Sequence, residues 1–236
     1  MPKRSSTTPL TPASRKQQML RSLVCDDAYE RHARQLGATR IAGVDEVGRG
    51  ALFGPVVAAA VILPEQIEFT GLRDSKQLRP SARERLASEI EQCAIAISIA
   101  AIDAATIDRV NIYQATRLAM LAAVNDLAPA ADHLLIDAMR LDHACAQTSI
   151  IYGDSLSLSI AAASVVAKVY RDGLMSQLDA KYPQYGLAAH KGYGTARHRA
   201  ALHEHGPTPL HRQSFAPVAE QLRLPTLSQT AQEPRP

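Results

Sequence analysis

The stretch from Gly43 to Pro55, with the sequence GVDEVGRGALFGP, constrains the fold of this chain more than any other. It places two neighbouring carboxylates, Asp45 and Glu46, in an apolar run typical of a strand, and it holds four of the chain's 12 glycines. A buried charge is costly unless it is paired or bound to a cation, and glycine lets the backbone approach a ligand closely. The stretch therefore indicates either a metal site beside a backbone surface that contacts an anion, or a strand that ends in a tight turn with exposed acids.

The composition is that of one globular domain without a membrane span. The chain has 236 residues, of which 46% are apolar and 21% charged, and this is enough for one sizeable core. Its apolar runs are far shorter than a transmembrane helix. Three well-separated cysteines without a CxxC pair indicate neither a zinc site nor a disulfide framework, and they predict a reducing, cytoplasmic compartment. Because no heptad pattern or apolar surface stripe is evident, we expect a monomer.

Two periodicities divide the chain into strands and helices. Alternating or short apolar runs predict strands over residues 41–47, 56–63, 94–102, 133–138 and 148–153. Helical spacing with capping residues predicts helices over residues 19–36, 80–93, 111–127, 160–181 and 195–205. Because the link between the first two strands is short, we expect them to pair as an antiparallel, hairpin-like unit. The succession, simplified as β-β-β-α-β-α-β, predicts an α/β fold with a mixed sheet flanked by helices.

The ends of the chain differ in composition from its middle. Residues 1–18 are rich in Ser, Thr, Pro and basic side chains, and they predict a disordered basic tail. Residues 19–217 predict one domain, which includes a small C-terminal helical part from about residue 182. Residues 218–236, rich in Pro, Gln and Thr, predict a flexible tail.

Two further acids follow apolar runs. Asp137 ends the run LLID, and Asp154 follows IIYG. The carboxyl ends of strands in open sheets gather ligands, and clustered carboxylates need cations such as Mg²⁺ or Mn²⁺ to offset their repulsion. Two such ions about 4 Å apart are the usual arrangement for phosphodiester cleavage. Adjacent strand residues point to opposite faces, so Glu46 joins Asp45 only if the glycines that follow break the regularity of the strand.

Basic residues are concentrated locally. Residues 1–40 carry eight Lys/Arg against three Asp/Glu, whereas the remainder carries 18 against 20. Candidate anion contacts, each of which could equally be a solvated surface cation, are Arg49, Lys76, Lys168 and Lys191. The region from Lys181 to Phe215 holds five Lys/Arg, five of the eight His and one acid. This region suits contact with a nucleic-acid backbone and base stacking, unless its histidines simply lie on the exposed face of the last helix.

Five blocks of sequence resemble the bacterial ribonuclease HII family, the type 2 ribonucleases H. In order they are GVDEVGRGALFGPVVAAAVIL, DSKQL, LLIDA, GDSLSLSIAAASVVAKVYRD and HKGYGTARH, and together they span about residues 40–217. The resemblance implies an RNase H-like α/β fold with a small C-terminal helical part. It also implies an endonuclease that cleaves the RNA strand of RNA–DNA hybrids, and single ribonucleotides embedded in duplex DNA, during replication and repair.

The resemblance also implies roles for particular residues. The four catalytic acids, which would hold two Mn²⁺ or Mg²⁺ ions and leave 5′-phosphate and 3′-hydroxyl ends, fall on Asp45, Glu46, Asp137 and Asp154. The motif that contacts the ribose 2′-hydroxyl falls on Gly48, Arg49 and Gly50. The tyrosine that stacks on the sugar beside the junction falls on Tyr193, and a phosphate-contacting lysine falls on Lys76.

The chain departs from the family pattern at two places. Many relatives have a basic residue at the position of Tyr152, so one phosphate contact is missing here or supplied elsewhere. The first 40 or so residues have no counterpart in the resemblance.

Two other interpretations of the function stay open. Another nuclease or transposase of the same fold would not need the Gly48–Gly50 turn or Tyr193, and a catalytically inactive hybrid-binding protein would have lost at least one of the four acids.

Overall fold

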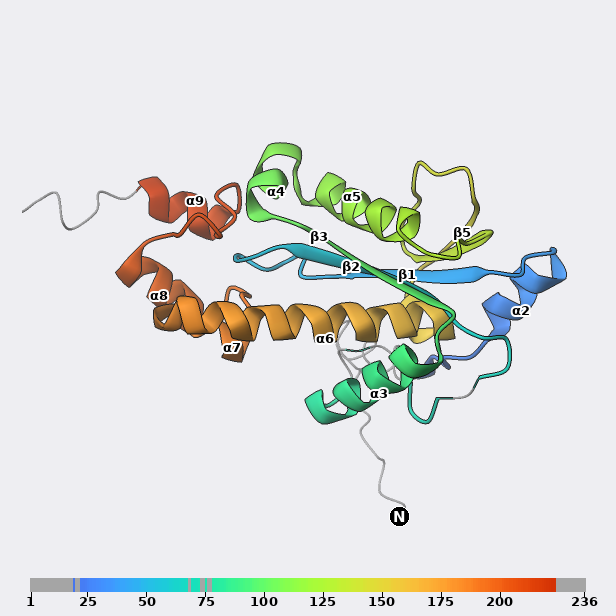
Figure 1. Cartoon of the computed structure of the whole chain (residues 1–236). Helices are drawn as coiled ribbons and strands as arrows, with labels where there is room; N and C mark the ends of the chain where they lie inside the picture. The colour runs from blue at the N-terminus through green and yellow to red at the C-terminus, as the bar shows by residue number, and fades with distance from the viewer. Residues whose placement is uncertain (1–18, 20–21, 68, 73–74, 76–77, 224–236) are drawn as a thin grey trace, which may run out of the picture.

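A five-stranded mixed sheet forms the centre of the molecule (Figure 1). The computed structural model describes residues 19, 22–67, 69–72, 75 and 78–223. The strand order is β3-β2-β1-β4-β5, with bounds β1 Ile41–Val47, β2 Val56–Ile62, β3 Ala96–Ile102, β4 His133–Asp137 and β5 Ala146–Ile150. β2 runs antiparallel to both β1 and β3, whereas β4 runs parallel to both β1 and β5. The predicted mixed sheet and the predicted β1–β2 pairing are both confirmed.

Helices cover both faces of this sheet (Figure 1). α5 lies on one face, and α6 with α3 lies on the other. The bounds of the main helices are α2 Ala28–Gln35, α3 Pro80–Cys93, α4 Ala104–Val110, α5 Ile112–Asn125 and α6 Leu158–Lys181. The C-terminal part holds η3 Pro183–Tyr185, α7 Leu187–His190, α8 Ala196–His205 and α9 Ala216–Arg223, and the 3₁₀ turn η2 Gly153–Ser155 precedes α6. None of the helices in these described residues is long and apolar enough to cross a membrane.

Small side chains let the layers of the fold approach closely. All seven residues of β2, VVAAAVI, are buried, as expected for a strand with helices on both faces. The α6 face of β1 has a glycine at Gly43, where a Cβ atom would lie only 2.0 Å from the backbone carbonyl carbon of Ser159. The first turn of α6 therefore packs directly on the backbone of β1.

The element boundaries differ from the predictions in several places. The helix predicted over residues 19–36 is interrupted: Met19 and Ser22 are helical, residues 23–25 are not, and α2 begins at Ala28. The simplified order was wrong: α3 separates β2 from β3, and no helix separates β4 from β5. The strand predicted over residues 148–153 is an edge strand that ends at Ile150. α4 was not predicted. The helix predicted from residue 111 is confirmed as α5, and the side chain of Asn111 caps it by accepting a hydrogen bond from the Gln114 amide.

The C-terminal boundary also lies later than expected. α9 runs to Arg223, past the boundary predicted at residue 217, and its Val218 is fully buried. The predicted tail at residues 1–18 and the last residues from 224 lie outside the described part of the chain.

Candidate functional site

Two acids lie side by side at the ends of the two central parallel strands. In the β1–β4 register Val44 pairs with Ile136, so the next residues along each strand are Asp45 and Asp137. Residues in register on neighbouring parallel strands point to the same face, about 4.8 Å apart. That face is the one covered by α6, because Leu135, two residues before Asp137 and therefore on the same face of β4, packs against Ile160 of α6. Asp45 is only 2% exposed, so the two carboxylates meet in a largely buried setting.

Glu46 leaves β1 from the opposite face. β1 stays regular through Val47, and Glu46 pairs with Ala58 in the β1–β2 ladder. The first glycine with a left-handed backbone, Gly48 at φ +90°, comes only after the strand has ended. The side chain of Glu46 is 12% exposed and lies 3.3 Å from the guanidinium of Arg49. The glycines therefore do not turn Glu46 toward Asp45.

Asp154 lies in η2 rather than at a strand end, four residues after Ile150. The chain reverses at Tyr152, whose φ of +60° is left-handed, and the amide of Gly153 then donates to Oδ1 of Asp137 at 2.8 Å. Asp154 itself is 7% exposed and accepts a hydrogen bond from the hydroxyl of Ser155. The turn into α6 is thereby tied to the carboxylate at the end of β4.

The donor set fits a hard divalent cation. Asp45 and Asp137 supply only carboxylate oxygens, which suit Mg²⁺ and Mn²⁺, and a cation would offset the repulsion between two acids on one buried face. In the part of the chain that the structure describes, no group of three or more His, Cys, Asp or Glu side chains is arranged to hold a metal ion. The fit therefore rests on the neighbouring pair of acids, because Glu46 lies on the other face of β1 and Asp154 lies in η2.

The glycine-rich turn after β1 meets the C-terminal region. Ala51 forms a bridge with Tyr193, and the Leu52 amide donates to the Gly192 carbonyl at 2.8 Å. A Cβ atom on Gly50 would lie 4.0 Å from the ring of Tyr193. The structure thus brings together Gly50 and Tyr193, which are distant in sequence and were both predicted as substrate contacts.

Two buried arginines hold this turn, and neither was predicted from the sequence to have a role. Arg171 of α6 and Arg212, which precedes α9, are both 0% exposed. Their five side-chain hydrogen bonds all go to backbone carbonyls, three from Arg171 and two from Arg212. Burial, and then the charge of Arg171, lowers the pKa of Arg212 to about 9, and burial also lowers the pKa of Arg171. An arginine side chain in a protein keeps its charge at neutral pH. The one sequence feature that could have indicated a role for Arg171 is its position within the AKVYRD block.

The histidines of the C-terminal region do not all lie on an exposed helix face. His198 and His211 are fully buried, and their Nε2 atoms are 3.3 Å apart. His190 stacks on His198 with ring centroids 4.5 Å apart. Burial lowers the pKa of His198, and burial followed by the neighbouring His198 lowers the pKa of His211 to about 3. These rings are core residues beneath Tyr193, so the alternative that places them in solvent is wrong for His198 and His211.

The predicted phosphate contact at Lys76 lies outside the described residues. Its neighbour Ser75 is buried and hydrogen-bonded at 2.8 Å to Ser164 of α6. The other basic candidates of this region, Lys168 and Lys191, both lie near Asp172: the ammonium of Lys168 contacts its carboxylate and that of Lys191 its carbonyl.

The arrangement as a whole is that of a ribonuclease H-like enzyme. The crystal structure of the ribonuclease H2 from Pyrococcus horikoshii OT3 is similar, with a TM-score of 0.68 and 25% sequence identity, over 78% of this chain and 97% of that one. Its sheet with flanking helices is the fold found here.

Sequence comparison narrows the class to one family. The family model for ribonuclease HII matches residues 42–218. The ribonuclease HII of Koribacter versatilis (strain Ellin345) is 57% identical over 89% of this chain and 83% of its own length. That of Geobacillus kaustophilus (strain HTA426) is 56% identical over 83% of this chain and 75% of its own. The chain belongs to the ribonuclease HII family, and it is therefore an endoribonuclease, a phosphodiester hydrolase.

Proposed function

We propose that this endoribonuclease cleaves single ribonucleotides embedded in duplex DNA as well as the RNA strand of RNA–DNA hybrids, and so removes ribonucleotides during DNA replication and repair. Ribonuclease H activity on hybrids follows from membership of the family. The observation that carries the finer proposal is the meeting of Gly50 with Tyr193 near the ends of the strands that bear the acids. Such a surface suits recognition of one sugar rather than a long stretch of backbone.

We propose that Asp45, Glu46, Asp137 and Asp154 together hold Mn²⁺ or Mg²⁺. When bound, such ions activate a water molecule and stabilise the leaving oxygen of a phosphodiester, so that the products carry 5′-phosphate and 3′-hydroxyl ends. The protein contributes the positions of the acids. The Gly153 amide orients the carboxylate of Asp137 by its hydrogen bond to Oδ1, and the parallel register places Asp45 beside it. For Glu46 to join the site, its ion pair with Arg49 would have to open and the end of β1 would have to twist, because its side chain leaves the strand on the other face.

The 2′-hydroxyl is the group that distinguishes RNA from DNA at a single nucleotide. The turn at Gly48, Arg49 and Gly50 is exposed at its last two residues and has no bulky side chain at two of its three positions. We propose that its backbone contacts this hydroxyl. Tyr193, whose ring lies beside Gly50, would stack on the adjacent sugar. Lys76, which precedes α3 in the sequence, would contact a neighbouring phosphate.

One assay tests the cleavage specificity. Four duplexes of identical sequence are incubated with Mn²⁺ or Mg²⁺ and mapped to the nucleotide: all-DNA, one ribonucleotide, a short run of ribonucleotides, and a full hybrid. We expect cleavage of every substrate except all-DNA. Cutting of all-DNA would favour another nuclease of this fold, and binding without metal-dependent cleavage would favour a hybrid-binding protein.

Two variants test the assigned roles in the same assay. Asp45→Asn keeps the shape of the buried side chain but removes its charge, so we expect cleavage to be lost; near wild-type activity would refute the metal assignment. Tyr193→Ala should weaken the preference for the junction between DNA and ribonucleotide, with Tyr113→Ala, an exposed tyrosine on α5, as the matched control. We also propose that the chain is a cytoplasmic monomer. Light scattering of the purified chain tests its monomeric state.

A further inference from the structure

Arg171 joins the two halves of the substrate-contacting surface. Its Nε and Nη2 donate to the carbonyls of Pro55 and Phe53 at 3.0 and 3.1 Å. Its Nη1 donates at 2.9 Å to the carbonyl of Lys191. The same guanidinium lies 5.7 Å from the centre of the Tyr193 ring. One side chain of α6 therefore contacts the turn after β1 and the segment that carries Tyr193.

Arg212 fixes the same turn from a third segment. Its Nη1 donates to the carbonyl of Arg49 at 2.8 Å, and its Nε to that of Gly54 at 3.0 Å. The Arg212 amide donates to the carbonyl of Leu52, and its guanidinium lies over the ring of Phe215 at 5.2 Å. The middle residue of the glycine-arginine-glycine turn is thus held through its backbone while its own side chain is 44% exposed.

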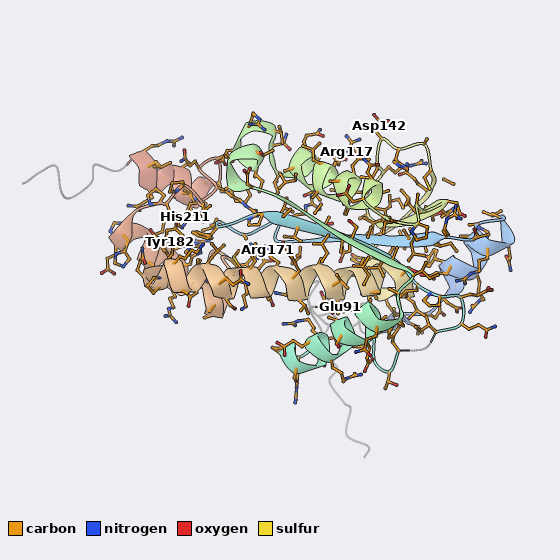
Figure 2. All side chains as sticks on the ribbon, in the orientation of Figure 1. Glu91, Arg117, Asp142, Arg171, Tyr182 and His211 are labelled. Atoms are coloured by element: carbon orange, nitrogen blue, oxygen red, sulfur yellow. The ribbon has the colours of Figure 1, made fainter. Side chains whose placement is uncertain are left out.

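The turn is shaped around these guanidiniums. At Gly48 a Cβ atom would lie 2.2 Å from Nε of Arg171, and the φ of +90° is one that side chains rarely adopt. Figure 2 labels Arg171 on the α6 side of the sheet and Arg117 on the α5 side. Glycine at this position therefore makes room for the arginine as well as for a ligand.

Two buried charges of the same sign are a costly way to stabilise a loop. Apolar residues of equal volume usually fill a core as well or better, and every side-chain hydrogen bond described for Arg171 and Arg212 ends on a carbonyl rather than on a carboxylate. What a guanidinium offers over an apolar side chain is a rigid, planar fork that holds several carbonyls at set positions. The arrangement suits a role in positioning.

We propose that Arg171 and Arg212 are positioning residues that set the separation between the Gly48–Gly50 backbone and the Tyr193 ring, and that this separation selects the junction between DNA and ribonucleotide as the cleavage site. The inference rests on the proposed function, because it assumes that these two elements contact the substrate. Neither arginine touches the reacting phosphate. Each acts through the segments that its donors hold.

Arg→Lys substitutions separate positioning from charge. A lysine keeps the buried positive charge but replaces the planar fork by a single ammonium, which cannot hold the carbonyls of Phe53, Pro55 and Lys191 in their observed places together. The substrate is a duplex with four consecutive ribonucleotides in one strand, which offers one junction cut and several internal cuts. Because a displacement of about 1 Å can cost about a hundredfold in rate, we expect Arg171→Lys and Arg212→Lys each to lower the ratio of junction to internal cuts at least tenfold.

Two control variants identify effects that come from the substitution type or from stability alone. Arg117→Lys makes the same change in the half-buried arginine of α5, whose guanidinium contacts Gln114. Leu86→Ala opens a cavity in the fully buried core between α3 and α6, and it should lower the melting temperature. Both should keep the wild-type cut pattern. If the lysine variants do not fold, Phe215→Leu loosens the guanidinium of Arg212 without removing it, and it should shift the pattern in the same direction.

The outcomes distinguish the inference from the function on which it rests. If the wild-type chain shows no ribonucleotide-dependent cutting, the proposed function fails. Suppose instead that the wild-type chain cuts at the junction and that the folded lysine variants keep its ratio of junction to internal cuts. The positioning role is then refuted while the proposed function stands, and Phe215→Leu decides in the same way if the lysine variants do not fold. A fall in the ratio that Leu86→Ala reproduces at equal loss of melting temperature also refutes the role, since stability alone would explain it.

Discussion

Acidification should destabilise this protein through the buried histidines beneath Tyr193. The amide of Thr208 donates to Nδ1 of His211 at 2.9 Å, and an amide can donate only to a nitrogen without a proton. Nδ1 of His198 lies 3.0 Å from the carbonyl of Tyr193, which can only accept, so this nitrogen carries a proton. One proton then remains between the two Nε2 atoms, on His211. The network is complete with both rings neutral, and a further proton would break it.

The magnitude follows from the pKa of His211. Burial, and then His198, lowers it from 6.5 to about 3 in the folded chain. Below pH 6.5 the unfolded chain takes up a proton that the folded chain refuses until about pH 3, so the stabilisation present above pH 6.5 is lost as the pH falls. Between pH 7 and pH 5 this loss amounts to about 2 kcal/mol. The lowered pKa of His198 acts in the same direction.

Urea unfolding at pH 7 and pH 5, followed by circular dichroism, measures this difference. His211→Gln removes the titrating ring, and an amide oxygen can still accept from Thr208. We expect the variant to be less stable than the wild type at pH 7 but to lose about 2 kcal/mol less on acidification. His203→Gln, on the exposed face of α8, should keep the wild-type dependence. Equal losses in the wild type and His211→Gln would refute the reasoning.

Two further variants test the packing that supports the site. In Gly43→Ala the new methyl group would lie 2.0 Å from the Ser159 backbone, so we expect a large fall in melting temperature. Gly173→Ala in α6 has nothing within 4 Å of its new methyl group, so it should raise the free energy of unfolding by about 0.5–1 kcal/mol. Equal melting temperatures for the two would contradict this account of the β1–α6 contact. Glu30→Ala removes the buried carboxylate that accepts from Ser157 and Ser159 at the start of α6, and denaturant titration should show a loss of about 2 kcal/mol. An unchanged midpoint would show that this cap contributes nothing.

The sheet and the pair of acids could be predicted because their signals are local. Short apolar runs predicted β1 and β2, and a short link predicted their antiparallel pairing. The position of Asp137 at the end of an apolar run placed it at the carboxyl end of a strand, and the register then set it beside Asp45. Asp154 was likewise predicted from the apolar run before it, but it lies in η2 rather than at the end of β5, because the chain turns at Tyr152.

The rest depends on contacts between distant segments. Four of the five side-chain hydrogen bonds of Arg171 and Arg212 reach carbonyls 116 to 163 residues away in the chain. A carbonyl carries no sequence signal, because every residue has one. The burial of His198 and His211 likewise depends on the packing of the C-terminal segments around Phe53 and Tyr185. The face of Glu46 could be stated only once β1 proved regular to Val47.

The number of residues in α6 fixes the distance between its contact with β1 and the guanidinium of Arg171. Its first turn is seated on the bare backbone of Gly43, and Arg171 lies twelve residues after Ser159, a span of about 18 Å at 1.5 Å per residue. Inserting one residue between them would turn everything beyond it by about 100° and carry the guanidinium away from the carbonyls it holds. In the descent of such chains, insertions and deletions should therefore accumulate in the connection between β4 and β5 and be absent from this stretch of α6.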